Sequence, residues 1–256
     1  PAKPAKPVRV GLALGGGAAR GFAHVGVIKT LEAQGINPDI VVGTSAGAVV
    51  GALYAAGNNG FELQKLAHKL DEGKLADWSL PDRGVLKGEG LQKFVNDAVG
   101  QRPIEALRKP FAAVATDLAS GQSIVFRTGN TGMAVRASAT VPGVFKPVTI
   151  NGHDYVDGGL SSLIPVHEAK QLGADVVIAV DISAPPRRQP LRGTLDVLLQ
   201  TFTIMGNNLA RYELRDADVV IRPQVNDIGP ASFEQRNAAI LQGERAALAA
   251  MPQIRS

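Results

Sequence analysis

The fold of this chain is decided by the stretch Val41-Val42-Gly43-Thr44-Ser45-Ala46-Gly47-Ala48-Val49-Val50, which predicts an apolar strand, a sharp turn and a helix. Gly43 and Gly47 flank Ser45 with the spacing G-x-S-x-G that a strand-to-helix elbow requires. The serine takes a strained backbone conformation there, and side chains two residues away would collide with the turn. The elbow places the Ser45 hydroxyl at the N-terminus of a helix, where unpaired N–H groups favour negative charge. The stretch therefore predicts a nucleophilic serine, although a buried Gly-rich strand end produces the same pattern by chance.

Strands and helices alternate along most of the chain, which predicts a three-layer α/β/α fold with a mainly parallel central sheet. The expected strands are residues 8–14, 38–42, 111–116, 123–127, 148–150, 153–156, 175–181 and 219–221. The expected helices are residues 20–34, 46–56, 61–70, 91–99, 131–137, 166–172, 194–214 and 233–248. Asn151-Gly152 between two of these strands is typical of a tight hairpin turn.

Length and composition indicate a single domain over residues 8–256. The chain has 256 residues, of which 45% are hydrophobic and 20% charged, enough for one large core. It has no cysteine, which excludes disulfides, thiolate zinc sites and cysteine nucleophiles, and its four histidines do not suggest a metal site. The net charge of +4 and the scattered basic residues argue against nucleic acid as a partner.

Residues 1–7 are rich in proline and lysine and predict a flexible, extended tether. Such a tether often follows a cleaved export signal or a lipid anchor, so we favour the periplasmic side of the cell envelope over the cytoplasm. Residues 40–61 carry no charge, but glycine, serine and asparagine interrupt them. We interpret this segment as a buried strand and helix and not as a membrane span.

Two further segments predict features of the surface. Residues 71–90 are polar and Gly-rich and contain the only tryptophan, Trp78, so we expect a mobile lid there. Arg187, Arg188 and Arg192 form a local basic cluster in a Pro-rich loop, and we consider a role for it in contacting anionic lipid headgroups.

The loop Gly15-Gly16-Gly17-Ala18-Ala19-Arg20-Gly21 lies between the first strand and the first helix. A dinucleotide fingerprint starting at Gly15 needs a glycine where Arg20 stands, and a phosphate loop needs Lys and then Ser or Thr after Gly21, where Phe22 follows. What remains is a set of backbone N–H groups at a helix start, open to an anion such as the oxyanion of a carbonyl under attack. Oxyanion binding, a purely structural turn and nucleotide binding stay open on the loop alone.

A serine nucleophile needs a base, either a histidine or a carboxylate. In α/β-hydrolases the histidine comes last in chain order, and after Asp157 only His167 remains, at a helix start where a solvent-facing position is expected. Asp157 is the better candidate because it ends a hairpin strand, and Gly158-Gly159 permit a tight turn that directs its carboxylate over the sheet edge. Taken alone, Asp157 also fits a plain turn aspartate.

Three motifs in this order resemble the patatin-like phospholipase family: the loop ending Ala19-Arg20-Gly21, Gly43-Thr44-Ser45-Ala46-Gly47, and Asp157-Gly158-Gly159. Residues 8 to about 182 follow its bacterial branch, including residues 26–28, 115–118 and 138–145. The resemblance implies a Ser–Asp dyad without histidine, lipid acyl hydrolase activity, and an oxyanion hole formed by the loop Gly15 to Gly21. Many members have a third glycine where this chain has Ala18, whose amide still serves the site if its φ is negative.

These residues suggest a two-step acyl transfer. Asp157 accepts the proton as Ser45 attacks the ester carbonyl, the amides of Gly16, Gly17 and Ala18 with Arg20 nearby hold the oxyanion, and water then releases the fatty acid. The scheme uses no metal and no cofactor. Because an aspartate normally has a pKa of about 3.9, we expect partial burial to raise the pKa of Asp157.

The lead hypothesis is a phospholipase or esterase acting on lipid acyl chains at a membrane or micelle surface. A general carboxylesterase on soluble esters and a non-catalytic lipid- or partner-binding module are the alternatives. Of the other polar residues, we expect His24 to be packed or to cap a helix and Asp117 to tie a turn. His153 either orients Asp157 or serves the strand alone.

Overall fold

The structure is a computed structural model, and it describes residues 7–70, 88–186 and 190–256. Three predictions fall partly outside these ranges: the tether in residues 1–6, the lid in residues 71–87, and the basic cluster at Arg187 and Arg188. Arg192, the remaining member of that cluster, is exposed just before a long helix.

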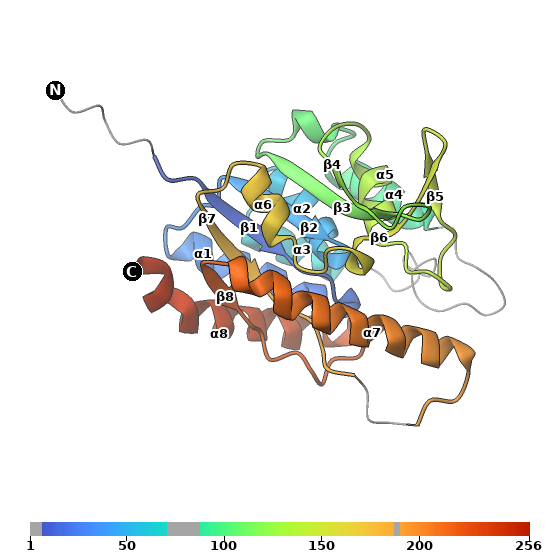
Figure 1. Cartoon of the computed structure of the whole chain (residues 1–256). Helices are drawn as coiled ribbons and strands as arrows, with labels where there is room; N and C mark the ends of the chain where they lie inside the picture. The colour runs from blue at the N-terminus through green and yellow to red at the C-terminus, as the bar shows by residue number, and fades with distance from the viewer. Residues whose placement is uncertain (1–6, 71–87, 187–189) are drawn as a thin grey trace.

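The sheet has a parallel centre and an antiparallel end (Figure 1). Five strands pair in parallel in the order β3 (Phe111–Asp117), β2 (Ile40–Thr44), β1 (Val10–Leu14), β7 (Val176–Val180) and β8 (Val219–Ile221). Antiparallel pairs add β4 (Ser123–Phe126) and β6 (His153–Asp157) to β3, and β5 (Val148–Ile150) to β6. Asn151 and Gly152 have φ values of 52° and 81°, which confirms the tight turn predicted between β5 and β6.

Helices cover both faces of the sheet. The first layer contains α1 (Phe22–Ala33), α2 (Ala46–Ala55), α3 (Gly60–Lys69), α4 (Glu89–Ala98), α5 (Thr131–Ser138) and α8 (Arg236–Arg255). The second contains α6 (Val166–Gln171) and α7 (Thr194–Glu213). Along β1, Leu12 and Leu14 pack into the first layer's core and Ala13 into the second, because successive strand residues point to opposite faces. The predicted three-layer α/β/α fold is confirmed.

Most predicted boundaries agree with the structure within a few residues, and the main exception is the last helix. We expected this helix to end at residue 248, but α8 continues across Pro252 to Arg255. Met251 is buried and Ile254 packs against the core. Their burial outweighs the one backbone hydrogen bond that proline cannot donate.

Strands β2 and β6 meet end to end along one edge of β3, and this arrangement positions the site. On β3, residues 111–114 pair with β2, residues 115–117 with β6, and residues 113–116 with β4. The β4 pairing overlaps both others, so β4 occupies one edge of β3 while β2 and β6 share the opposite edge. Thr44 and Asp157 therefore lie opposite consecutive residues of β3, and Ser45, which follows Thr44, comes next to Asp157.

Helices α1 and α8 approach so closely that glycine is required on both. A Cβ atom on Gly26 would lie 1.9 Å from the carbonyl oxygen of Ile240, and one on Gly243 would lie 1.9 Å from that of Ala23. Both obstacles are backbone atoms, so a side chain at either position forces the helices apart.

Gly243→Ala should therefore lower the free energy of unfolding by about 1–3 kcal/mol or more, because the added methyl group overlaps the backbone of α1. Gly193→Ala is a matched control, since a Cβ there meets no atom within 4 Å and its φ of −166° suits alanine. Urea denaturation followed by circular dichroism measures both variants. Equal stability of the two would contradict the close packing of α1 on α8.

Candidate active site

Ser45 occupies the strained elbow that the sequence predicts. Its φ of 54° lies in the left-handed region that favours glycine, and its ψ is −120°. Strand β2 ends at Thr44 and α2 begins at Ala46, so Ser45 alone makes the change of direction. The residue is 8% exposed and is the N-cap of α2.

The elbow glycines are required because backbone atoms crowd both positions. A Cβ on Gly43 would lie 2.2 Å from the carbonyl oxygen of Gly47, so the first turn of α2 folds directly against the end of β2. A Cβ on Gly47 would lie 2.0 Å from the carbonyl oxygen of Leu14 in β1. The predicted collision is confirmed, but for Gly47 the obstacle is a neighbouring strand and not the turn itself.

Ser138, the last residue of α5, ties the elbow to β3. Its hydroxyl accepts a hydrogen bond from the backbone N–H of Ser45 at 2.8 Å and donates one to the carbonyl oxygen of Val114. Val114 lies opposite Thr44, at the point where β2 stops pairing with β3. Leaving a buried carbonyl without a partner costs about 1–3 kcal/mol, and Ser138 removes this cost while it holds the elbow.

Asp157 is held by hydrogen bonds to its backbone and its side chain. Its N–H donates to the carbonyl of Thr140 at 2.8 Å, and its carbonyl accepts from the hydroxyl of Thr116 at 2.9 Å. Its carboxylate Oδ1 accepts from the N–H of Gly159 at 2.7 Å. The turn needs Gly158, because a Cβ there would lie 2.2 Å from a carbonyl oxygen of β3.

Burial perturbs the carboxyl group of Asp157. Burial raises its pKa to about 6, while hydrogen bonds from the Gly159 N–H and with the Ser45 side chain act in the lowering direction. The residue is only 7% exposed, and the increase in pKa that we expected from burial is confirmed. The two side chains, far apart in the sequence, thus come together at one site.

The glycine loop lies beside the elbow, and two of its amides have no acceptor. The N–H of Gly15 donates to a carbonyl of β7 and the N–H of Gly16 to that of Leu163, each at 3.1 Å. The N–H groups of Gly17 and Ala18 have no hydrogen-bond partner among the described residues. Of the three amides that we assigned to an oxyanion hole, that of Gly16 is already engaged, so those of Gly17 and Ala18 remain.

Ala18 has a φ of 51°, and the negative φ that we required for its amide to serve the site is not found. The left-handed conformation costs an alanine about 1–2 kcal/mol, which explains why glycine suits this position. The amide is nevertheless unbonded, because the short 3₁₀ helix Ala18–Gly21 starts here and the first residues of a helix lack an acceptor in the preceding turn.

Two basic residues support the loop. Arg20 donates from Nε to the carbonyl of Ile228 at 2.9 Å. His24 is fully buried, and its Nε2 donates to the carbonyl of Gly15 at 2.8 Å. Burial lowers the pKa of His24 to about 4, so it is neutral near pH 7. The expectation that His24 is a packed histidine is confirmed.

A cavity of about 630 Å³, called the large cavity below, opens over Ser45 and Asp157. The loop residues Gly16, Gly17, Ala18 and Arg20 contribute to one side of it. Helix α7 forms a wall through Asp196, Leu199, Gln200, Phe202, Thr203, Gly206 and Asn207. All four histidines lie within the described residues, and none of them lines this cavity.

His153 does not orient Asp157, which corrects one of the two possibilities we considered. Its Nδ1 lies 3.0 Å from Oδ2 of Asp117, because His153 begins β6 while Asp157 ends it, about 13 Å further along the strand. Asp117 also accepts hydrogen bonds from the N–H groups of Ala119 and Ser120. It therefore ties a turn, as expected.

The described residues contain neither a metal-binding cluster nor a membrane-spanning helix. Among the described residues, no group of three or more histidine, aspartate or glutamate side chains is arranged to hold a metal ion. Of the helices in the described ranges, none combines the length and the apolar character needed to cross a bilayer. The uncharged segment 40–61 forms β2, α2 and the start of α3, as interpreted from the sequence.

Sequence reasoning assigned no role to Ser138, Thr140 or the wall formed by α7. Ser138 and Thr140 lie in the segment 138–145, one of those that carry the family resemblance, and this was the only signal for them. The periodicity of α7 predicted a helix, but it did not indicate that one side of the helix faces Ser45.

Comparisons with known sequences agree with the geometry. The chain matches the family model described as patatin-like phospholipase over residues 12–170. It is 40% identical over 181 residues to an uncharacterized NTE family protein of Mycobacterium tuberculosis, covering 68% of this chain and 49% of that protein. It is 34% identical over 188 residues to a protein of Meyerozyma guilliermondii named lysophospholipase NTE1, covering 71% of this chain and 13% of that protein. The chain thus spans about half the length of the mycobacterial relative and a small part of the fungal one.

The fold is similar to that of VipD from Legionella pneumophila, with a TM-score of 0.63 and 16% sequence identity over 96% of this chain and 67% of VipD. This likeness concerns the fold alone. The family model covers more than half of the chain and includes the loop at Gly17, the elbow at Ser45 and the turn at Asp157. The chain belongs to the patatin-like phospholipase family.

Proposed function

We propose that this chain is a serine acyl hydrolase of the phospholipase A or esterase type, with Ser45 as nucleophile and Asp157 as its general base. The single observation that carries the proposal is that these two side chains, a strained N-cap serine and a buried carboxyl group, both line the large cavity. Family membership and the name of the fungal relative support a lipid ester as the substrate.

The reaction proceeds in two steps. The carboxylate of Asp157 takes the proton from the Ser45 hydroxyl as its oxygen attacks the ester carbonyl, and the N–H groups of Gly17 and Ala18 hold the resulting oxyanion. Collapse of this intermediate breaks the ester bond, and the leaving alcohol takes the proton from Asp157. Water then attacks the acyl-enzyme, with Asp157 again accepting a proton, and the fatty acid is released as Ser45 regains its hydrogen.

A carboxylate is a suitable base here because of its surroundings. With a pKa of about 6, Asp157 is ionised near neutral pH and yet more basic than an exposed aspartate. The N–H of Gly159 fixes Oδ1 and so orients the carboxylate.

The outer side of α7 supports hydrolysis at a lipid surface. Residues 197–210 contain no charged side chain, although α7 lies on the outside of the molecule (Figure 1). We call Val197, Ile204, Met205 and Tyr212 the α7 outer stripe; they are 52%, 45%, 55% and 68% exposed. Their spacing places them on one side of the helix, while Thr203 and Gly206 on another side line the large cavity. The outer side of α7 thus combines exposed apolar side chains with the uncharged polar Thr201 and Asn208, and exposed Arg211 lies beside them. Such a side is suited to lie in a membrane interface, which would bring lipid to the cavity.

Replacing the nucleophile tests the function directly. Ser45→Ala should reduce hydrolysis of p-nitrophenyl esters by on the order of 10³-fold or more, because no other group can form the acyl-enzyme. A fluorophosphonate probe should label the wild-type protein, and peptide mapping should place the label on Ser45. Ser256→Ala, at an exposed serine outside the large cavity, is a control that should keep the wild-type activity. A wild-type protein that neither hydrolyses any ester nor reacts with the probe would instead indicate a binding module.

The pH dependence of hydrolysis tests the base. Because Asp157 must be ionised to accept a proton, kcat/KM should fall about tenfold per pH unit below its pKa of about 6 and level off above it. His153→Gln and His167→Gln should leave this acidic limb in place, because neither side chain lines the large cavity. A flat profile between about pH 4 and 8, or loss of the limb in a histidine variant, would contradict the assignment.

The membrane role of the α7 outer stripe predicts a binding defect. Ile204→Glu/Met205→Glu should weaken binding to phosphatidylcholine vesicles at least about tenfold, because two charged groups replace side chains that the interface would bury. Leu241→Glu/Leu248→Glu on α8 is the matched control, as these leucines are 43% and 55% exposed. Vesicle co-sedimentation measures both proteins. Equal binding of vesicles by the two variants would show that another surface of the protein binds lipid.

A further inference from the structure

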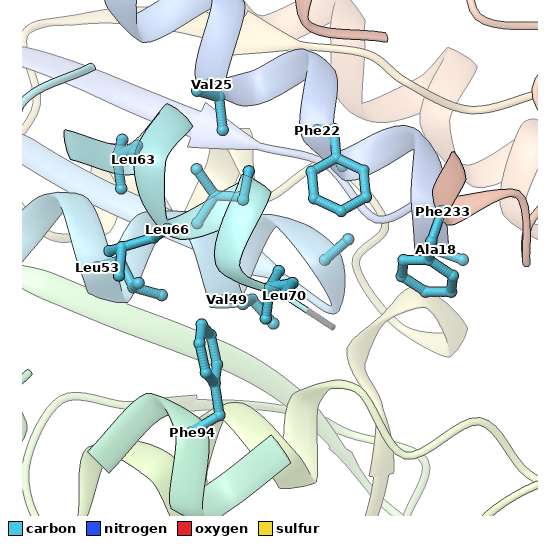
Figure 2. Close-up of a pocket in the computed structure, with 14 residues that line it drawn as sticks. Ala18, Phe22, Val25, Val49, Leu53, Leu63, Leu66, Leu70, Phe94 and Phe233 are labelled. Carbon is cyan, nitrogen blue, oxygen red and sulfur yellow. The ribbon is translucent and has the colours of Figure 1, made fainter. Parts of the chain in front are cut away.

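A second hollow adjoins the elbow, on the side of the sheet covered by α1, α2 and α3. It has a volume of about 60 Å³, and every residue that lines it is Gly, Ala, Val, Leu or Phe. We call it the apolar groove. Figure 2 shows Val49, Leu66, Leu70 and Phe94 around the same space, with Phe22 and Phe233 at one end. The described residues that line the groove therefore offer it no side-chain hydrogen-bond donor or acceptor.

The apolar groove and the large cavity meet at the proposed catalytic groups. Ala18 lines both hollows, and the consecutive residues Ser45 and Ala46 line the large cavity and the groove respectively. An ester carbon attacked by Ser45, with its oxygen at the amides of Gly17 and Ala18, lies at this boundary. The two parts of the ester, its acyl chain and its alcohol, thus start between the two hollows, which share Ala18 as a lining residue.

The two hollows differ in chemistry in the way that the two parts of a lipid ester differ. The large cavity contains hydrogen-bonding side chains such as Arg20, Thr203 and Asn207, which suit a polar alcohol part. A polar group placed in the apolar groove loses its hydrogen bonds to water without replacement, whereas each buried methylene strengthens binding by up to about fourfold.

We propose that the apolar groove binds the acyl chain of the ester and that the large cavity binds its alcohol part. This assignment rests on the proposed function. The groove has a limited volume of about 60 Å³, so it accommodates a limited number of methylene groups. The kcat/KM for p-nitrophenyl esters should therefore rise from acetate to about octanoate, by up to about fourfold per methylene, and then level off.

Substitutions of Leu66 test the groove, because this half-buried residue of α3 lines the groove but not the large cavity. Leu66→Trp fills the groove and should lower the ratio of kcat/KM for octanoate to that for acetate by at least about tenfold, the value of two lost methylenes. Leu66→Ala enlarges the groove and should move the plateau to longer chains. Leu248→Trp and Leu248→Ala, at a leucine of α8 that is 55% exposed, are matched controls and should keep the wild-type profile.

The outcomes separate this proposal from the proposed function. If both Leu66 variants keep the wild-type chain-length profile while Ser45-dependent ester hydrolysis persists, the acyl chain binds elsewhere and only the groove assignment fails. If the wild-type protein hydrolyses no ester and Ser45 is not labelled, the proposed function fails and the groove assignment with it. Thermal unfolding identifies a variant that does not fold, and if Leu66→Trp is one, the direction of the shift in Leu66→Ala decides the question.

Discussion

The end-to-end meeting of β2 and β6 on one edge of β3 is the constraint on which the rest of the site depends. One strand enters from the parallel half of the sheet and the other from a hairpin, and the backbone hydrogen bonding of β3 has a gap at the junction between them. The carbonyl of Val114 lies at this gap, and the hydroxyl of Ser138 satisfies it while accepting the N–H of Ser45. The same side chain, Ser138, thus gives the buried backbone carbonyl a hydrogen-bond partner and holds the nucleophile in place.

Two unfavourable features at the site are held in place by the surrounding sheet. Ser45 and Ala18 have positive φ values that a residue other than glycine avoids, and Asp157 is a carboxyl group buried from water. None of these would persist in a flexible segment. They persist here because Leu14 and Val114 are themselves fully buried in central strands, so the elbow and the Asp157 turn pack against backbone that cannot move away.

The fold was predicted well because its signals are local. Runs such as 176–180 and the hairpin at Asn151-Gly152 indicate their own structure, and alternation of strands and helices implies the layers. The errors came from tertiary packing. Burial of Met251 extends α8 past Pro252. In the antiparallel end of the sheet, His153 contacts Asp117 and not Asp157. At the loop, the sequence indicated oxyanion donors, but only the contacts of Gly16 with Leu163 distinguish engaged amides from unbonded ones.

The sequence by itself determined the elbow, the candidate serine and aspartate, and the layered fold, because steric limits at glycines and hydrophobic periodicity act over a few residues. The tertiary structure alone decided that Ser45 and Asp157 line the same cavity, that Ser138 holds Ser45 in place, and that α7 and the apolar groove flank the site. Those facts depend on strand register and on which faces of distant helices pack together. No short segment fixes the register or the packing of helix faces, because the free energy of burying apolar surface depends on the whole assembled sheet.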